Sequence, residues 1–240
     1  MPSHGSPRPL WALTVFFGLA TTVFIVWFLR VVPPNGCQGP PRPGVSALVQ
    51  FQMARTPQDM EDVFGRPSDP CRAEMVAALD RANTADLYGF IPTYGAFLLC
   101  FLLAMMRDGG GSAARLGLVA LVAGLGLDVL ETATQLRLTR ELPGSPAALQ
   151  ALAIGSTGKY AALAILGFCA GATMYARGGG AGRIAALVCI AGSAAALRGL
   201  VNPSVRALLG TGTGITWIVM FLYAIATLVQ GDRVRRDVLS

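Results

Sequence analysis

The sequence is dominated by long apolar runs that are separated by short segments carrying arginine. Five runs are about 20 residues long, and a sixth, slightly shorter run contains one Arg. A run of this length crosses a ~30 Å hydrocarbon layer as an α-helix, whereas a lone strand in lipid would leave its backbone unpaired. The pattern predicts an all-α, polytopic integral membrane helix bundle, a single membrane domain over residues 1–240 with six transmembrane helices. The spans are expected at about 10–32, 87–106, 116–136, 149–176, 184–202 and 214–230.

Composition excludes an ordinary soluble domain. The 240 residues are 53% hydrophobic and 13% charged, and a soluble domain of this length has no core large enough for so much apolar surface. The net charge of +6 does not indicate nucleic acid, because the chain has a single Lys and its Arg residues are spread over the gaps. The expected partner is the lipid bilayer, and protein partners remain open.

The arginines of the short loops predict the orientation. With the N-terminus inside, eight Arg residues are cytoplasmic and three lie in the two short outer loops, which agrees with the positive-inside rule. We expect a multi-pass protein of the plasma (inner) membrane, with both termini cytoplasmic and residues 33–86 forming an extracytoplasmic cap. The cytoplasmic set is Arg8, Arg107, Arg115, Arg177, Arg183, Arg233, Arg235 and Arg236, and the outer set is Arg137, Arg140 and Arg206.

Cysteine positions agree with this orientation. Cys37 and Cys71 are the two cysteines outside the apolar runs, and both fall in the predicted cap. An outward-facing loop lies in an oxidising compartment, where such a pair forms a disulfide. We therefore expect a Cys37–Cys71 disulfide.

The first part of the cap carries helical signals. Apolar residues recur at helical spacing between Val45 and Met53, which predicts an amphipathic helix on the membrane surface. Thr56-Pro57 has the form of an N-cap followed by the first helical residue. Such a cap is either a lid over an outward-facing site or an ordered segment without a ligand.

The second part of the cap is expected to continue into the membrane. Asp69-Pro70 again has the form of an N-cap and first helical residue. The helical pattern then runs with few breaks through Asp86 into the second span. We expect one long helix that projects above the membrane and is kinked near Pro92.

Ionisable residues inside the apolar runs indicate a site. Each costs roughly 2.5–3.5 kcal/mol in the hydrocarbon layer, so it usually has a partner or a purpose. Counted from the cytoplasmic ends at ~1.5 Å per residue, they fall at a common depth in the outer part of the membrane. Their spacing also places Asp128 and Glu131 on one face of the third span. We expect an outward-opening pocket lined by Asp128, Glu131, Lys159, Arg198, Asn202, Asp86 and Tyr94.

One use of this pocket is recognition of a lipid, isoprenoid or other amphiphile. Lys159 and Arg198 would bind a phosphate, since guanidinium groups suit bidentate contacts. Asp128 and Glu131 would then be the candidate catalytic residues, acting as general acid or base. This is the leading hypothesis, for binding or for modification.

Other interpretations of the same residues stay open. No cofactor is evident, although Asp80, Asn83 and Asp86 form a weak candidate site for a divalent cation, because magnesium and calcium prefer oxygen ligands. The protein is alternatively a small proton-coupled transporter, in which a buried carboxylate exchanges its proton against Lys159. It is alternatively a structural or assembly subunit of a membrane complex, whose buried charges only neutralise one another.

Known catalytic motifs give no reaction. The sequence contains neither G-x-S-x-G nor H-E-x-x-H, so classical hydrolase chemistry is unsupported and an enzymatic role is left open. The stretch Gly210–Gly214 lacks the lysine and the strand context of a phosphate-binding loop. A flexible turn before the sixth span is the expected structure there.

Three segments carry a resemblance to known proteins: Phe51–Thr56, Leu79–Tyr88 and Leu127–Thr132. In these segments the chain is similar to uncharacterised bacterial multi-span integral membrane proteins. The similarity covers roughly the first two thirds of the chain. It supports the multi-span fold and implies no particular activity.

Overall fold

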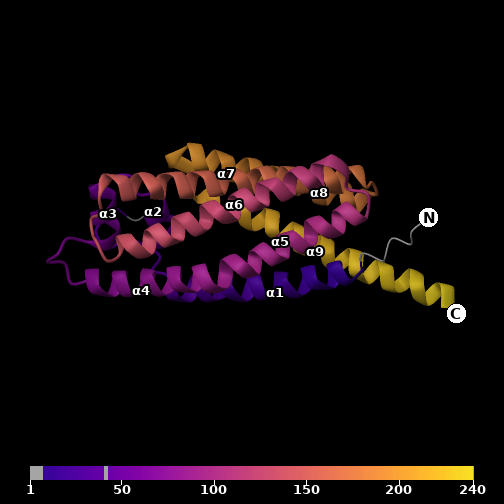
Figure 1. Cartoon of the computed structure of the whole chain (residues 1–240), viewed down its shortest axis with the longest axis horizontal. Helices are drawn as coiled ribbons and strands as arrows, with labels where there is room; N and C mark the ends of the chain where they lie inside the picture. The colour runs from indigo at the N-terminus through magenta and orange to yellow at the C-terminus, as the bar shows by residue number, and fades with distance from the viewer. Residues whose placement is uncertain (1–7, 41–42, 240) are drawn as a thin grey trace. The chain divides into compact units, whose positions relative to one another are not determined.

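The computed structural model describes residues 8–40 and 43–239, with side chains described as far as Gln230. Arg233, Arg235 and Arg236, which enter the charge count above, therefore lie outside the described side chains. The described chain is helical and contains no strand (Figure 1). Six of its helices, or continuous helical segments, are long and apolar enough to cross a membrane. This confirms the predicted helical class and indicates a multi-pass membrane protein.

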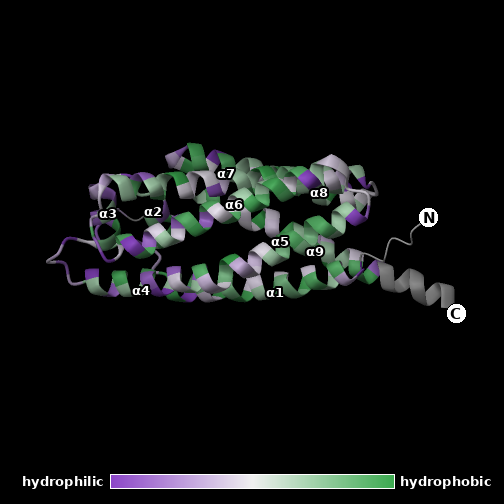
Figure 2. Cartoon of the chain, viewed as in Figure 1, coloured by the Kyte–Doolittle hydropathy of each residue, from purple (hydrophilic) through white to green (hydrophobic). Residues whose placement is uncertain are grey.

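The long helices follow the predicted order along the chain. The second of them is built from three consecutive elements, of which the middle one is a π-helical turn, η1. Figure 2 shows apolar residues along the long helices and many hydrophilic residues in the α2–α4 part of the chain. The elements are α1 (Arg8–Val31), α4 (Arg72–Ala85), η1 (Asp86–Phe90), α5 (Ile91–Arg107), α6 (Gly111–Leu138), α7 (Pro146–Ala176), α8 (Gly180–Val201) and α9 (Ala207–Leu239).

The π-helical turn has a local cause. Pro92 is the second residue of α5 and has no backbone N–H, so the carbonyl one turn earlier cannot receive its usual hydrogen bond. Widening the preceding turn into a π-helix accommodates this mismatch, and such turns often occur at functional sites. The helix nevertheless continues from α4 into α5, as the sequence pattern predicts.

Two short helices, α2 (Ala47–Gln52) and α3 (Pro57–Phe64), lie between α1 and α4. Thr56 caps α3 as predicted: its side chain accepts from the backbone N–H of Asp59, and the Asp59 carboxylate accepts from the backbone of Thr56. The prediction for Asp69-Pro70 is wrong. Helix α4 begins two residues later, because the Asp69 carboxylate accepts from the backbone N–H of Arg66 and closes a turn instead.

The α2 helix is not the surface helix expected from its periodicity. Four of its six residues are buried within the protein, including Phe51 and the polar Gln50 and Gln52. Both glutamines have internal partners, since Gln50 donates to the carbonyl of Val45 and Gln52 accepts from Tyr160. A helix whose polar side chains find partners inside the protein has no need of a water-facing side.

The expected disulfide is present. Cys37 and Cys71 are bonded, with 5.9 Å between their Cα atoms, and they link the segment after α1 to the residue before α4. Gly65 lies against this bond with a positive φ of 77°, and a Cβ there would lie 2.7 Å from Cys37 Sγ. The bond stands beside an apolar core that α2, α3 and α4 form with the ends of α6 and α7.

By its internal contacts the chain divides into two compact units. The first comprises Met1–Thr21, Thr93–Val122 and Ala161–Ser240, and the second comprises Thr22–Pro92 and Ala123–Tyr160. In the first unit, the carboxylate of Asp108 accepts hydrogen bonds from the indole of Trp11 and from Arg177. The second unit contains the buried charges described below.

The predicted flexible turn at Gly210–Gly214 is wrong, because these residues belong to α9. Gly212 packs directly on α8, where a Cβ would lie 2.4 Å from the carbonyl oxygen of Gly192. Small residues permit this close approach of two apolar helices. The glycines that suggest a turn in isolation are therefore packing residues in the first unit.

We predict that Gly212→Ala destabilises the protein by about 1–3 kcal/mol, because the added methyl group meets backbone that has nowhere to move. Gly214→Ala is the matched control on the same helix, since nothing lies within 4 Å of its Cβ position. Thermal unfolding of the two purified variants, followed by tryptophan emission, measures the difference. Equal unfolding temperatures would contradict the packing role of Gly212.

Candidate functional site

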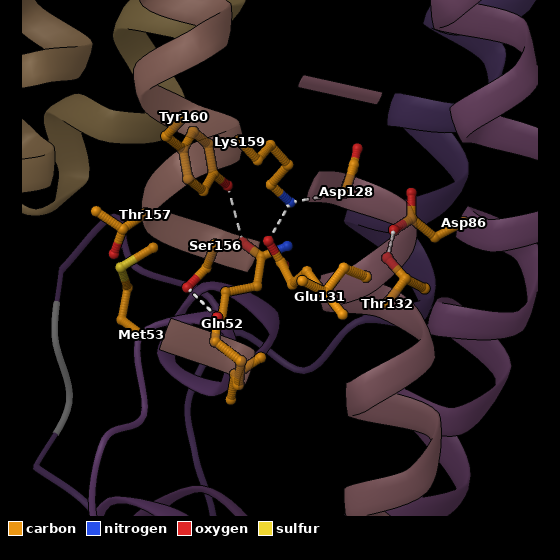
Figure 3. A network of polar contacts seen from close by, with 12 residues as sticks. Gln52, Met53, Asp86, Asp128, Glu131, Thr132, Ser156, Thr157, Lys159 and Tyr160 are labelled. Atoms are coloured by element: carbon orange, nitrogen blue, oxygen red, sulfur yellow. Dashed lines mark hydrogen bonds and ion pairs between the residues drawn. The ribbon is translucent and has the colours of Figure 1, made fainter. Parts of the chain in front are cut away.

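The second unit holds one lysine between two carboxylates, all inside helices long and apolar enough to cross a membrane. Lys159 Nζ on α7 lies 2.9 Å from Asp128 Oδ1 and 2.8 Å from Glu131 Oε2, both on α6. The three residues are 5%, 3% and 0% exposed, respectively. We call them the lysine–carboxylate cluster (Figure 3). The sequence-based expectation that Asp128 and Glu131 share a helix face agrees with their common approach to Lys159.

The two contacts of Lys159 differ in kind. The ammonium group donates a hydrogen bond to Asp128, whereas its contact with Glu131 is an ion pair without hydrogen-bond geometry. Neither carboxylate oxygen of Glu131 has a hydrogen-bonding partner among the described residues. Glu131 is therefore the less completely satisfied of the two acids.

Two glycines on α7 make this contact possible. A Cβ on Gly155 would lie 2.9 Å from the Cα of Glu131, and a Cβ on Gly158 would lie 2.8 Å from the Leu127 side chain. Because neither glycine has a side chain, α7 lies close against α6 in the turn that carries Lys159. The close approach brings the ammonium group to both acids and leaves little exposed surface on any of the three.

A third buried carboxylate, Asp86, belongs to the π-helical turn η1. It accepts a hydrogen bond of 2.9 Å from the hydroxyl of Thr132, the residue after Glu131. Figure 3 shows its side chain beside Thr132 on the same side of α6 as Asp128. The second unit thus places three buried carboxylates near one buried ammonium group.

The α2 helix and the residues after it contact α7 beside the cluster. The hydroxyl of Tyr160 donates to Gln52 Oε1 at 2.8 Å. The guanidinium group of Arg55 donates to the hydroxyls of Ser156 and Thr157 at 3.1 and 3.3 Å. These hydrogen bonds connect the loop between the first two spans to the turn that carries Lys159, and Figure 3 shows the one between Tyr160 and Gln52.

The roles of Gln52, Arg55, Thr132 and Tyr160 were not predicted from the sequence. The only available signal was the resemblance in Phe51–Thr56 and Leu127–Thr132, which singled out three of them without assigning a role. Hydrogen bonds between residues about a hundred positions apart leave no mark in helical spacing.

Three of the predicted pocket residues belong to the first unit and are not part of this cluster. Tyr94 is buried and stacks on Trp217, with 5.0 Å between ring centroids. Arg198 is exposed on α8. The Asn202 side chain accepts from the backbone N–H of Ser204 and begins a short 3-10 helix, η2 (Pro203–Val205).

The three side chains suggested as cation ligands differ in their hydrogen bonds. Asp80 accepts from the hydroxyl of Thr139 at 2.9 Å, as Asp86 does from Thr132. Asn83 is fully buried and its side chain has no partner among the described residues. Within the described chain, no three His, Cys, Asp or Glu side chains are grouped so as to hold a metal ion.

Comparisons with protein-family models, with curated proteins and with solved structures gave no match to this chain. Its function must therefore be inferred from the chemistry of the side chains. The cluster contains more buried acids than buried bases, and each charge is expensive in an apolar layer. Such a site can neutralise its surplus charge by holding a proton or a cation.

We predict that Lys159→Met destabilises the protein by about 3–5 kcal/mol, because it leaves buried carboxylates without a counter-charge. Combining it with Asp128→Asn and Glu131→Gln should restore most of the lost stability, since the charges are then removed together. Thermal unfolding of the single and triple variants in the same detergent measures both effects. A Lys159→Met variant as stable as the original protein would show that the lysine does not balance these acids.

Proposed function

We propose that the protein is a small proton-coupled membrane carrier, and that the lysine–carboxylate cluster is its proton-exchanging site. The observation that carries this proposal is that two buried carboxylates lie within 3 Å of a single buried ammonium group. With the orientation that the arginine distribution predicts, the cluster belongs to the outer half of the membrane. A proton arriving from that side would reach it first.

Charge balance favours proton exchange over a purely structural ion pair. An ion pair that only fastens two helices needs one acid for each base. Among the described residues of the second unit, three buried acids, counting Asp86, accompany one buried base, Lys159. Two uncompensated charges would each cost roughly 2.5–3.5 kcal/mol in the hydrocarbon layer, so protonation of one or two of these acids is favoured.

The cluster can hold one proton in two ways. Either Glu131 is protonated while Lys159 pairs with Asp128, or Asp128 is protonated while Lys159 pairs with Glu131. Asp128 accepts a hydrogen bond from Lys159, whereas the contact of Glu131 lacks hydrogen-bond geometry, and this difference favours Glu131 as the acid that takes the proton. Lys159 Nζ lies within 3 Å of both carboxylates, so protonation of one would draw the ammonium group toward the acid that stays charged.

A carrier must link protonation to movement, and the contacts of α2 supply a candidate link. Tyr160 follows Lys159 directly and donates to Gln52, while Arg55 bonds Ser156 on the preceding turn. A shift of Lys159 between its two partners would act on the helix segment that holds these hydrogen bonds. Release of α2 and Arg55 from α7 would then accompany a change of protonation state.

A second candidate is the binding of a lipid or other amphiphile. In its favour, the second unit has an open apolar groove of about 440 Å³ at the end of α1. Against the anion-binding form of this idea, Lys159 is already neutralised by two acids. An amphiphile site would use the groove and would not depend on the charge of Glu131. The groove residues are Phe28, Leu29, Val32, Pro34, Gly44, Val45, Ser46 and Leu48.

We predict that a sudden acidification outside reconstituted vesicles produces a transient inward current of positive charge, because protons enter buried sites within the membrane. The measurement is a pH jump on a solid-supported membrane, with the proton as the only probe. The combined variant Asp128→Asn, Glu131→Gln should fall to the level of protein-free vesicles. Glu141→Gln, which neutralises an exposed acid, should retain the current.

An unchanged current in the doubly neutralised variant would contradict the proposal, as would the absence of any current from the original protein. The second result, together with a lipid adduct on the purified protein in native mass spectrometry, would favour the amphiphile site. Destabilised variants without current or adduct would favour a structural subunit.

A further inference from the structure

Two hydrogen bonds of equal length join α4 and η1 to α6 and to Thr139, the first residue after α6. Thr139 donates to Asp80 and Thr132 donates to Asp86, both at 2.9 Å. The partner number on α6 falls as the number on α4 rises, so the two helices are antiparallel here. The bonds are six residues apart along α4 and η1 and seven residues apart along the partner segment, about 9 and 10.5 Å at 1.5 Å per residue.

By their positions along the two antiparallel helices, Asn83 and Gln135 fall between these two hydrogen bonds. Asn83 is midway between Asp80 and Asp86, and Gln135 is the matching residue of α6, between Thr132 and Thr139. Both side chains are fully buried. Among the described residues, neither the nitrogen nor the oxygen of either carboxamide has a hydrogen-bonding partner.

Together these residues form a continuous polar face that leads to the lysine–carboxylate cluster. One end is Asp80, which is only partly buried. At the other end, Glu131 lies one helical turn before Gln135 on α6. Neither of its carboxylate oxygens has a hydrogen bond within the described chain. We call this set the α4–α6 polar face; it comprises Asp80, Asn83, Asp86, Thr132, Gln135 and Thr139.

We infer that the α4–α6 polar face binds a file of water molecules that carries protons between Asp80 and Glu131. This inference rests on the proposed function, because it supplies the proton route to the same cluster. A buried carboxamide requires both a donor and an acceptor as partners, and water offers both. The face also provides the several polar neighbours that a buried water requires.

A metal cation fits this face less well than water. A cation would satisfy the carbonyl oxygens of Asn83 and Gln135, but their NH₂ groups would still lack acceptors. The hydroxyls of Thr132 and Thr139 already donate to carboxylates, so each has lone pairs left to accept from water. Water molecules therefore satisfy every group of the face, and the carboxylates at both ends exchange protons with them.

The test is the rate at which the protonated carboxyl of the cluster exchanges its proton for deuterium. Infrared spectra identify this group as the carboxyl C=O band that Glu131→Gln or Asp128→Asn removes. After a switch to D₂O, the band shifts as deuterium arrives. The compared protein is the full chain in vesicles, either unchanged or with Asn83→Leu and Gln135→Leu combined.

We predict that the double leucine variant keeps the carboxyl band. Its carboxyl group should exchange the proton for deuterium roughly tenfold more slowly, because two side chains that hydrogen-bond the water file are lost. The control is Glu74→Gln, an exposed position on the side of α4 away from Asn83, which should exchange at the original rate. Leucine resembles both amides in size and removes unpaired polar groups, so folding should be preserved. Asn83→Leu alone carries the same expectation.

An unchanged exchange rate, with the carboxyl band intact, would overturn the water file and leave the proton-exchanging cluster in place. Absence of the band from the original protein at every pH would overturn the proposed function and this inference with it. The two failures are therefore distinguishable in one set of spectra.

Discussion

The placement of one ammonium group between two carboxylates is the contact on which the second unit depends. An ion pair in apolar surroundings is tolerable only where its members approach closely and no charge is left alone. That requirement explains the glycines at 155 and 158, which let α7 lie against α6 beside Glu131 and Leu127. The next residue after Lys159 is Tyr160, whose hydroxyl donates a hydrogen bond to Gln52.

The surplus of buried acids over buried bases distinguishes this arrangement from an ion pair that only holds two helices together. Lys159 can balance one carboxylate, yet Asp128, Glu131 and Asp86 are all buried in the second unit. A protein that needed only a fixed contact would be more stable with fewer such groups. Retaining them is reasonable where the surplus is taken up by a proton that comes and goes. The amides of Asn83 and Gln135, which have no partner in the described part of the chain, would serve the proposed function as a route for that proton.

Much of the fold was predictable from the sequence, because lipid imposes simple rules. Apolar length predicts the long helices, cysteine position predicts the Cys37–Cys71 disulfide, and Thr56-Pro57 predicts the start of α3. Each of these depends on local sequence or on a single pair of residues. The Thr-Pro pair that begins α3 and the two cysteines outside the apolar runs are specific residue patterns, and few other structures would produce them.

The errors arose where distant contacts override a local pattern. Gly210–Gly214 is helical because Gly212 packs on α8, and α2 is buried because Gln52 finds a partner on α7. The sequence also placed Lys159 at the depth of Asp128 and Glu131, but depth alone did not reveal which cation meets which acid. The leading hypothesis gave Lys159 an external anion, and the structural alternative gave it these acids, which lie 2.9 and 2.8 Å from Lys159 Nζ.

The measurement that tests the central claim most directly is the protonation state of Glu131 as a function of pH. Solid-state NMR of the protein in bilayers, with ¹³C-labelled glutamate, reports it through the side-chain carboxyl signal that Glu131→Gln removes. An exchangeable proton predicts that this signal moves between its ionised and protonated positions as the pH is lowered. A Glu131 signal that stays in one position over the whole range in which the protein is folded would contradict proton exchange at this site.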